Sequence, residues 1–331
     1  MITSNNAAVA TWVCSGLALG IILSRFGVTR FCRLKLDLSD WLSGLGILVI
    51  VARLVVDHYL LVDGTANDAI VGHLHNLSKS KLQQIKIGSI LALIARLLDT
   101  TFYWLSTTIL LLFYSNLLHS LHWARIAIRC CWILLAATYV TVIVVTFTEC
   151  HPFHLYWQID PNPGQCTHAY AQLFLQGSFN IALDLSILFM SIPLLRMQGR
   201  TAGQKFRVTV MVFLGLFCII ITCVRIPLVV QGNSAQPSRT FFASIQIVTS
   251  AFVANTPTIY GRLQNERRKR AEQSIRRGSA PETWWSSRTT TRSGARDSLP
   301  PIDQAQGWED KTTAENDTAH IHNMTLDREM V

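Results

Sequence analysis

Long apolar runs separated by short polar segments fill most of the chain. A helix needs about 20 residues to cross a bilayer, and seven runs meet that length: Ala7–Ser24, Trp41–Val62, Ile87–Leu118, Ile126–Thr148, Ala169–Leu195, Val208–Val230 and Phe241–Leu263. Hydrocarbon offers the backbone no hydrogen-bond partners, and the runs lack the alternation typical of barrel strands. The pattern therefore predicts an all-α membrane protein, a seven-transmembrane helix bundle whose first partner is the lipid bilayer.

The composition agrees with this class. Half of the 331 residues are hydrophobic and 15% are charged, whereas soluble domains average about 25% charged residues. The sequence contains no Walker A, GxSxG, HExxH or nucleotide-binding glycine pattern. We therefore assign no catalytic residue, no metal site and no cofactor from the sequence.

The distribution of basic residues predicts the orientation of the bundle. No cationic segment precedes the first run, and Arg25, Arg30, Arg33 and Lys35 follow it, so the run is expected to be a retained anchor with the N-terminus outside. With that topology the inner segments hold 21 Lys and Arg, and the outer segments hold 4. We expect a multi-pass protein of the plasma membrane. The net charge of +9 then reflects topology and anionic inner-leaflet lipids, not a nucleic-acid partner.

The chain changes character after the seventh run. We expect residues 1–263 to form the membrane domain and residues 264–331 to form a basic, Ser/Thr/Arg-rich, disordered cytoplasmic tail. The first part of this tail can form a basic helix along the inner leaflet.

Two modification sites follow from this topology. Asn76 begins an Asn-Leu-Ser sequon in the predicted outer loop and can accept a glycan. Ser279 follows two arginines in the tail, a pattern that basophilic kinases favour, and its phosphorylation would weaken membrane contact. A merely solvated tail is the alternative.

The segment ECHPFHLYWQIDPNPGQC lies between the fourth and fifth runs. In an oxidising outer space its two cysteines, Cys150 and Cys166, are expected to form a disulfide. The alternative is a zinc or copper site, with ligands drawn from Cys150, His151, His154, Cys166 and His168. Oxidised sulfurs cannot act as thiolate ligands, so the sequence favours the disulfide.

Charged residues inside the runs are the strongest candidates for a site, because a charge in hydrocarbon costs about 2.5–3.5 kcal/mol. Arg53 and Asp57 are spaced i,i+4, and Arg96 and Asp99 i,i+3, so each pair can meet on one helix face. Together with Arg225 they are expected in the outer half, where they predict a ligand pocket open to the outside. The alternative is that these charges form interhelical pairs that only orient the bundle.

Asp184 differs from these charges because it is expected in the inner half, with Asn180 one turn above it. It could serve a switch or an ion site, or complete a polar core contact.

Several motifs carry a resemblance to a known family. The order LSDW, GHLH, ILLLFY, ECHPFHLYW, GQC and NIALDLSILFMSIPLL resembles that of the fungal rhodopsin-like integral membrane proteins, which are related to adhesion and host-sensing receptors and include members encoded in toxin clusters such as that for satratoxin. The most specific positions are Cys150, Pro152, Trp157, Cys166, Asn180, Asp184 and Pro193. The resemblance covers about residues 7–263 and implies a seven-helix fold.

The chain departs from that family in two places. STTILLLFY lacks the Lys and Ser that many members carry before the end of the third helix, and LSDW keeps Asp40 but loses one acidic neighbour. A retinal photoreceptor also needs a lysine in its last helix, and Phe241–Leu263 contains none. The sequence therefore argues against light sensing.

Two functions remain. The first is a receptor that senses an extracellular or lipophilic cue, such as a small lipophilic ligand, and signals to a cytoplasmic protein through helix rearrangement. The second is a membrane-embedded enzyme or accessory protein of a secondary-metabolite cluster, with pairs such as Arg96 and Asp99 in acid–base work. Transport is less favoured, because the seven runs show no inverted repeat.

Overall fold

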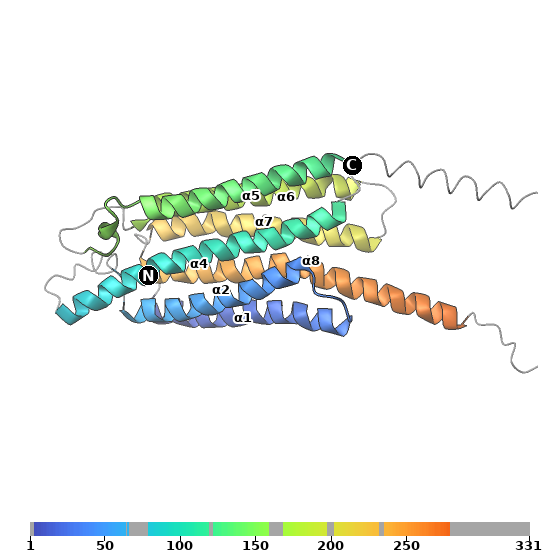
Figure 1. Cartoon of the computed structure of the whole chain (residues 1–331), viewed down its shortest axis with the longest axis horizontal. Helices are drawn as coiled ribbons and strands as arrows, with labels where there is room; N and C mark the ends of the chain where they lie inside the picture. Colours follow the sequence, from blue (N-terminus) through green and yellow to red (C-terminus); the bar gives the residue numbers. More distant parts are fainter. Residues whose placement is uncertain are drawn as a thin grey trace, which may run out of the picture. The chain divides into compact units, whose positions relative to one another are not determined.

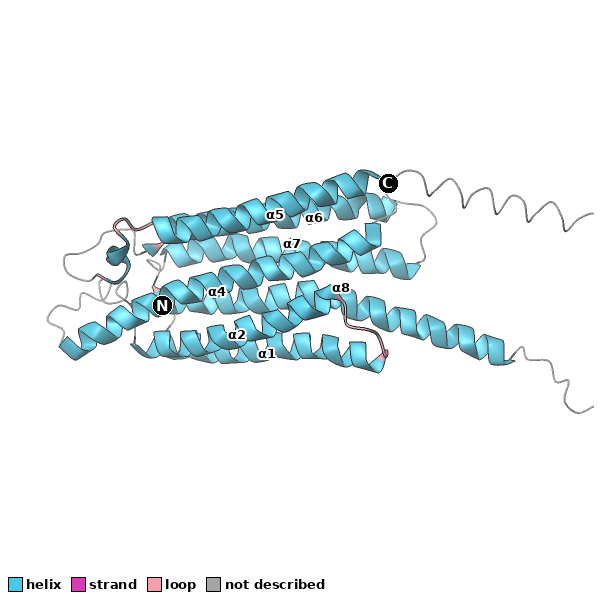
Figure 2. Ribbon diagram, in the orientation of Figure 1, coloured by secondary structure: helices cyan, strands magenta, loops and turns pink. Residues whose placement is uncertain are grey.

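The computed structural model describes residues 3–63, 65, 79–118, 122–158, 168–196, 202–231 and 235–278. This part of the chain consists of helices joined by short loops, and it contains no strand (Figure 2). Its elements are α1 (Ser4–Phe31), α2 (Leu38–Asp63), α4 (Lys79–Leu118), α5 (His122–Thr148), η1 (Phe153–Trp157), α6 (Tyr170–Arg196), α7 (Ala202–Gln231) and α8 (Gln236–Gly278). The predicted all-α fold of a helical membrane protein is confirmed.

The seven long helices of the described part form a closed ring. Each helix packs against the next one along the chain, and α1 closes the ring by packing against α8. The helices run along a common direction (Figure 1). α4 also contacts α6 and α8 across the ring. Polar groups on α4 can therefore meet groups from most of the bundle.

The bundle has two chemically different ends. The first, called here the η1 end, holds η1, the end of α2 and the starts of α4, α6 and α8 (Figure 1). The second, called here the turn end, holds the turn between α1 and α2 and the part of α8 that extends past the other helices (Figure 1). By the predicted orientation, the η1 end faces outward and the turn end faces the cytoplasm.

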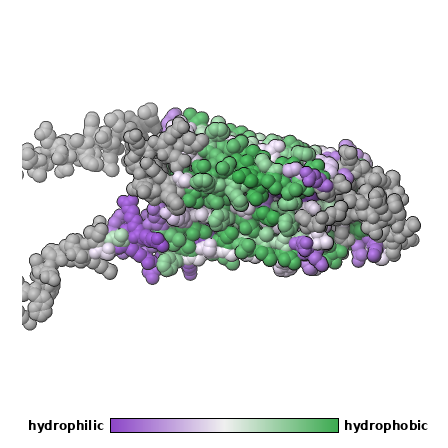
Figure 3. Space-filling view, turned by 180° about the vertical axis from the view of Figure 1, so that it is seen from behind, coloured by the Kyte–Doolittle hydropathy of each residue, from purple (hydrophilic) through white to green (hydrophobic). Residues whose placement is uncertain are grey.

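The outer surface of the bundle is apolar. On α1 the buried positions recur every three or four residues, from Ala7 to Thr29, so one stripe faces the core. Large side chains elsewhere point away from it, including Trp41 and Ile133, which are both 70% exposed. Figure 3 shows apolar residues over the middle of the bundle and hydrophilic ones at the projecting end of α8. An apolar surface of this extent is expected of a protein embedded in lipid.

By length and composition alone, five of the described helices can cross a membrane: α1, α2, α5, α6 and α7. The other two, α4 and α8, carry more polar residues, among them Arg96 and Asp99 on α4 and Arg239 and Asn255 on α8. These are also the helices that meet across the ring. The polar residues of α4 and α8 therefore lie between helices as well as at the helix ends.

The helices are longer than the predicted spans. α4 begins at Lys79 instead of Ile87, and α8 continues past Leu263 to Gly278. The added residues are rich in Lys, Arg, Gln and Glu, which favour helix, and a glycine is a common stop. The predicted basic helix is thus continuous with the seventh helix, and the rest of the predicted tail, residues 279–331, lies outside the described residues.

Two glycines allow α6 and α7 to approach closely. A Cβ atom on Gly177 would lie 2.7 Å from the Cδ1 of Ile226, and one on Gly215 would lie 3.0 Å from the Cδ2 of Leu188. Small residues at such contacts are the usual way in which membrane helices pack.

Candidate functional site

Arg53 is the centre of a polar cluster near the η1 end. Its side chain is 1% exposed and forms an ion pair with Asp57 at 3.0 Å, one turn along α2. It also pairs with Asp99 of α4, and both terminal nitrogens donate to the Ser244 hydroxyl of α8 at 3.3 Å. One buried guanidinium therefore ties three helices together.

Arg225 forms a second centre in the same region. Its Nη1 donates to the Gln246 side-chain oxygen and, at 3.4 Å, to the Tyr103 hydroxyl. The guanidinium carbon lies 6.0 Å from the centroid of the Tyr103 ring, a cation–π distance. Tyr103 in turn donates to the Ala243 carbonyl at 3.3 Å. These bonds connect α7, α4 and α8.

The structure brings all five predicted ligand-binding residues together. Asp57, Arg96, Asp99 and Arg225 line one cavity, together with Arg239, and Arg53 bonds to both of the aspartates. We call Arg53, Asp57, Arg96, Asp99, Arg225 and Arg239 the η1-end cluster. The cavity measures about 20 Å³, which is room for about one water molecule.

The pairing within the cluster differs from the simplest expectation. Spacing along the helix suggested that Asp99 would meet Arg96, yet Asp99 bonds with Arg53 of the neighbouring helix. The choice depends on how α2 and α4 are rotated against each other, which spacing within one helix does not determine. Both aspartates of the cluster thus share one arginine.

η1 and the residues around it cover this end of the bundle. Tyr156 and Cys150 are buried in a small apolar cluster with Leu93 of α4. The Tyr156 hydroxyl donates to the Thr146 carbonyl at 2.5 Å, and burial raises the pKa of this tyrosine. The Glu149 carboxylate accepts from the first turn of α6, at the backbone N–H groups of residues 171 and 172, at 2.8 and 3.3 Å. The segment is therefore anchored to both α4 and α6.

The predicted disulfide falls partly outside the described residues, because Cys166 lies there. The free cysteines of the described part are Cys14, Cys32, Cys130, Cys131, Cys218 and Cys223, and Cys150 is not among them. His151 and His154 are exposed, and no three His, Cys, Asp or Glu side chains of the described residues are grouped to hold a metal. The pairing of Cys150 with Cys166 stays a prediction, as do the modifications of Asn76 and Ser279, which also lie outside the described residues.

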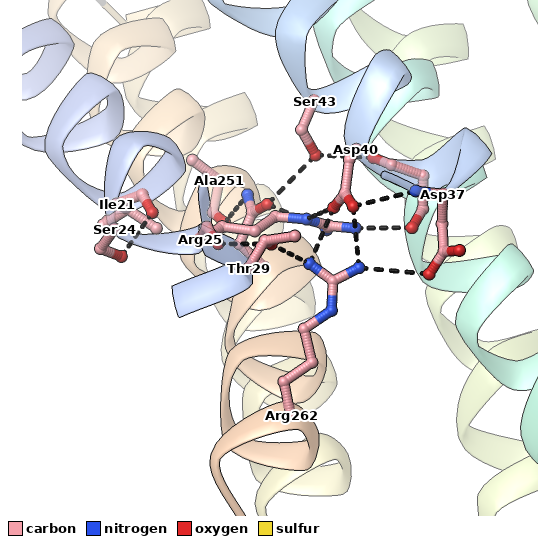
Figure 4. Close-up of polar contacts among 11 residues, drawn as sticks. Ile21, Ser24, Arg25, Thr29, Asp37, Asp40, Ser43, Ala251 and Arg262 are labelled. Atoms are coloured by element: carbon pink, nitrogen blue, oxygen red, sulfur yellow. Dashed lines mark hydrogen bonds and ion pairs between the residues drawn. The ribbon is translucent and has the colours of Figure 1, made fainter. Parts of the chain in front are cut away.

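A second buried ionic cluster, at the turn end, was not predicted (Figure 4). Arg25 of α1 donates from Nε to Asp40 at 2.8 Å, from Nη2 to Ser39 at 2.6 Å and from Nη1 to Asn255 at 3.2 Å. Arg262 of α8 holds the same Asp40 carboxylate with two bonds of 2.9 and 3.0 Å. We call Arg25, Asp40, Asn255 and Arg262 the turn-end cluster. It joins α1, α2 and α8.

The sequence contained one signal for this cluster. Asp40 is the acidic residue of the LSDW motif, but the first apolar run ends at Ser24, which predicts Arg25 in the loop after it. The structure corrects this placement, since α1 continues to Phe31 and Arg25 is 0% exposed. An arginine can lie this deep because the Asp40 carboxylate, also 0% exposed, compensates its charge.

A large cavity lies beside the turn-end cluster. It measures about 630 Å³ and is lined by residues of the α1–α2 turn, α4 and α8, among them Asp37, Asn116, Arg262 and Arg268. A volume of this size is within the range of small-molecule sites or of a short inserted segment. It is far larger than the cavity at the η1 end.

Asp184 lies between the two clusters. It lines a polar cavity of about 30 Å³ together with Asn180, Tyr103 and Gln246. Gln246 and Tyr103 are also partners of Arg225. The predicted neighbourhood of Asp184 and Asn180 is therefore confirmed, and it borders the η1-end cluster.

Comparison with known proteins identifies the family. The model of the fungal rhodopsin domain matches residues 24–263, which is most of the chain and contains both clusters. This protein belongs to the fungal rhodopsin family. No curated protein matches the chain. Membership in the fungal rhodopsin family confirms the resemblance and, with the apolar helices, supports a membrane protein of this kind. In this fungal rhodopsin protein the one lysine of α8 is Lys269, in the extension beyond the matched residues.

Proposed function

We propose that this protein is a receptor of the plasma membrane, which binds a cue at the η1 end and signals at the turn end. The observation that carries the proposal is that α8 bonds to both clusters. Ser244 and Gln246 of α8 bond to Arg53 and Arg225 at the η1 end. Farther along the same helix, Asn255 and Arg262 hold the turn-end cluster.

The proposed mechanism follows from these contacts. A cue that competes for Arg53 or Arg225 would weaken the bonds of α8 at the η1 end and change its position against α2, α4 and α7. Because the same helix holds Asp40 through Arg262, this movement would change the turn-end cluster and the large cavity beside it, where a cytoplasmic signalling protein can bind. The cue has to bind the shifted arrangement more tightly than the resting one to move the equilibrium.

The alternative function is an enzyme or an accessory protein in secondary metabolism. The η1-end cluster favours the receptor over it, since Asp57 and Asp99 both bond with Arg53. Neither carboxylate is then available as a general base. The alternative is kept as an outcome of the test below.

The first experiment measures the conformation at the turn end. Cys32 is 8% exposed and follows α1, one turn from the Thr29 hydroxyl that accepts a bond from Arg262. Arg262→Gln should raise the rate of maleimide labelling at Cys32, as measured by mass spectrometry. Arg268→Gln is the matched control, because Arg268 lines the same cavity but its ion pair among the described residues, with Glu272 on the same helix, is exposed.

The second experiment measures signalling in the native host. Arg262→Gln is expected to give a response without the cue, and Ser244→Ala, which keeps the Arg53 ion pairs, is expected to weaken the response while surface abundance stays normal. If both variants instead reduce a metabolite and leave signalling unchanged, the enzyme or accessory function is correct. Normal signalling in both variants, with normal abundance, would contradict the receptor proposal.

A further inference from the structure

Three arginines, Arg96, Arg225 and Arg239, line the η1-end cavity together with Asp57 and Asp99. Both aspartates form ion pairs with Arg53, and the Glu149 carboxylate adds negative charge near Arg96 and Arg239. Each buried arginine needs a negative partner or strong acceptors, because a charge without them is costly in hydrocarbon.

Two of these arginines reach only neutral oxygens within the described residues. Arg225 donates to the Gln246 amide and the Tyr103 hydroxyl, and Arg239 donates to the His168 carbonyl. Both side chains are buried, at 9% and 7% exposed. The region is therefore electropositive, with Arg225 inside a predicted span and Arg239 just before the next one.

Two donors at this cavity have no hydrogen-bond partner among the described residues. They are Arg225 Nε and Gln176 Nε2, and Gln176 is 5% exposed. Its oxygen is already used, because it accepts from Gln172 at 3.3 Å and from Thr100 at 3.4 Å. A buried donor without a partner costs about 1–3 kcal/mol. The cavity therefore lacks a group that accepts hydrogen bonds, and the surrounding charge favours a negative one.

We propose that the η1-end cavity binds a monovalent anion, held by Arg225 Nε and Gln176 Nε2 in the field of the neighbouring arginines. At about 20 Å³ the site selects a group the size of a halide ion or of the carboxylate of a small acid. The inference names the ligand chemistry of the proposed receptor's site and in that respect rests on the proposed function. Two acceptors of residues that line the cavity, Gln172 Oε1 and Asp57 Oδ2, also have no hydrogen bond among the described residues, so a bound water is the competing occupant.

The test uses the purified full chain in detergent. Thermal unfolding is followed by tryptophan fluorescence in sodium gluconate, with chloride or formate replacing gluconate at constant ionic strength. We expect the midpoint to rise with chloride or formate and to saturate, since a ligand that binds the folded state stabilises it. Saturation by chloride indicates a free halide, and saturation by formate alone indicates the head group of an organic acid.

Variants assign the effect to the cavity. Gln176→Leu removes the donor without changing charge and should raise the half-saturating anion concentration at least tenfold, as should Arg225→Gln. Arg129→Gln, on the exposed face of α5, removes a charge elsewhere and should leave it unchanged. A midpoint that does not depend on the anion, or that depends on it equally in all variants, would show that the cavity holds only water.

The assay also separates this inference from the receptor proposal. Anion binding that persists in purified protein, while Arg262→Gln leaves host signalling unchanged, would keep the site and refute the receptor. The reverse result would refute the site alone.

Discussion

Replacement of Asp40 by asparagine tests the buried ion pairs of the turn-end cluster. The Asp40 carboxylate accepts one bond from Arg25 at 2.8 Å, two from Arg262 at 2.9 and 3.0 Å and one from the Asp37 backbone at 3.1 Å. Asp40→Asn leaves two arginines, 0% and 9% exposed, without their shared counter-charge. Removing one partner of a buried ion pair costs about 3–5 kcal/mol, and we expect a loss of that size in the free energy of unfolding.

Asp37→Asn is the matched control for Asp40→Asn. Asp37 also pairs with Arg262, at 3.3 Å, but its side chain is 72% exposed, so its removal should cost less than about 1 kcal/mol. Both variants are compared with the parent protein by reversible unfolding in mixed micelles, followed by near-UV circular dichroism. Equal losses in the two variants would refute the argument that burial makes the Asp40 contact strong.

Three further predictions concern helix packing and the segment that covers the η1 end. Gly177→Val should destabilise the bundle by about 1–3 kcal/mol through overpacking of α6 against α7, whereas Gly20→Val, where nothing lies within 4 Å, should not lower the thermal midpoint. Cys150→Ser should lower the free energy of unfolding by about 3 kcal/mol, because it opens the loop that the predicted disulfide closes. Adding Cys166→Ser should cause no further loss, and alkylation of the Cys150 thiol in unreduced protein would contradict the pairing. Glu149→Gln should cost about 1 kcal/mol by weakening the first turn of α6, and unchanged hydrogen exchange in that turn would exclude this capping role.

The helices could be predicted from the sequence because the length of an apolar run is a local property. Their ends could not, because charged residues beyond the runs continue the helices where no strong stop occurs, as from Leu263 to Gly278. The extension of α1 to Phe31 had the larger consequence, since it turned Arg25 from a loop residue into a buried one.

The candidate sites, too, were predictable where they depend on local sequence and unpredictable where they depend on how the helices pack. An arginine or aspartate within an apolar run is visible in the sequence, and the structure brings all five of those residues together. Which aspartate meets which arginine depends on helix rotation, so the Arg53–Asp99 pair could not be predicted. The turn-end cluster depends on residues from α1, α2 and α8 that are distant in sequence, such as Asp40 and Arg262. The volume of a cavity is likewise a property of packing.

The continuity of α8 gives the molecule a mechanical property. The helix passes through the bundle and then extends as a basic rod with Arg267, Arg268, Lys269 and Arg270. A small tilt of α8 about the hydrogen bonds that hold it inside the bundle would move the end of its extension by a larger distance. If those basic residues bind anionic lipid, the membrane surface restrains the same helix. The lipid composition of that leaflet would then determine how much free energy a tilt of α8 costs.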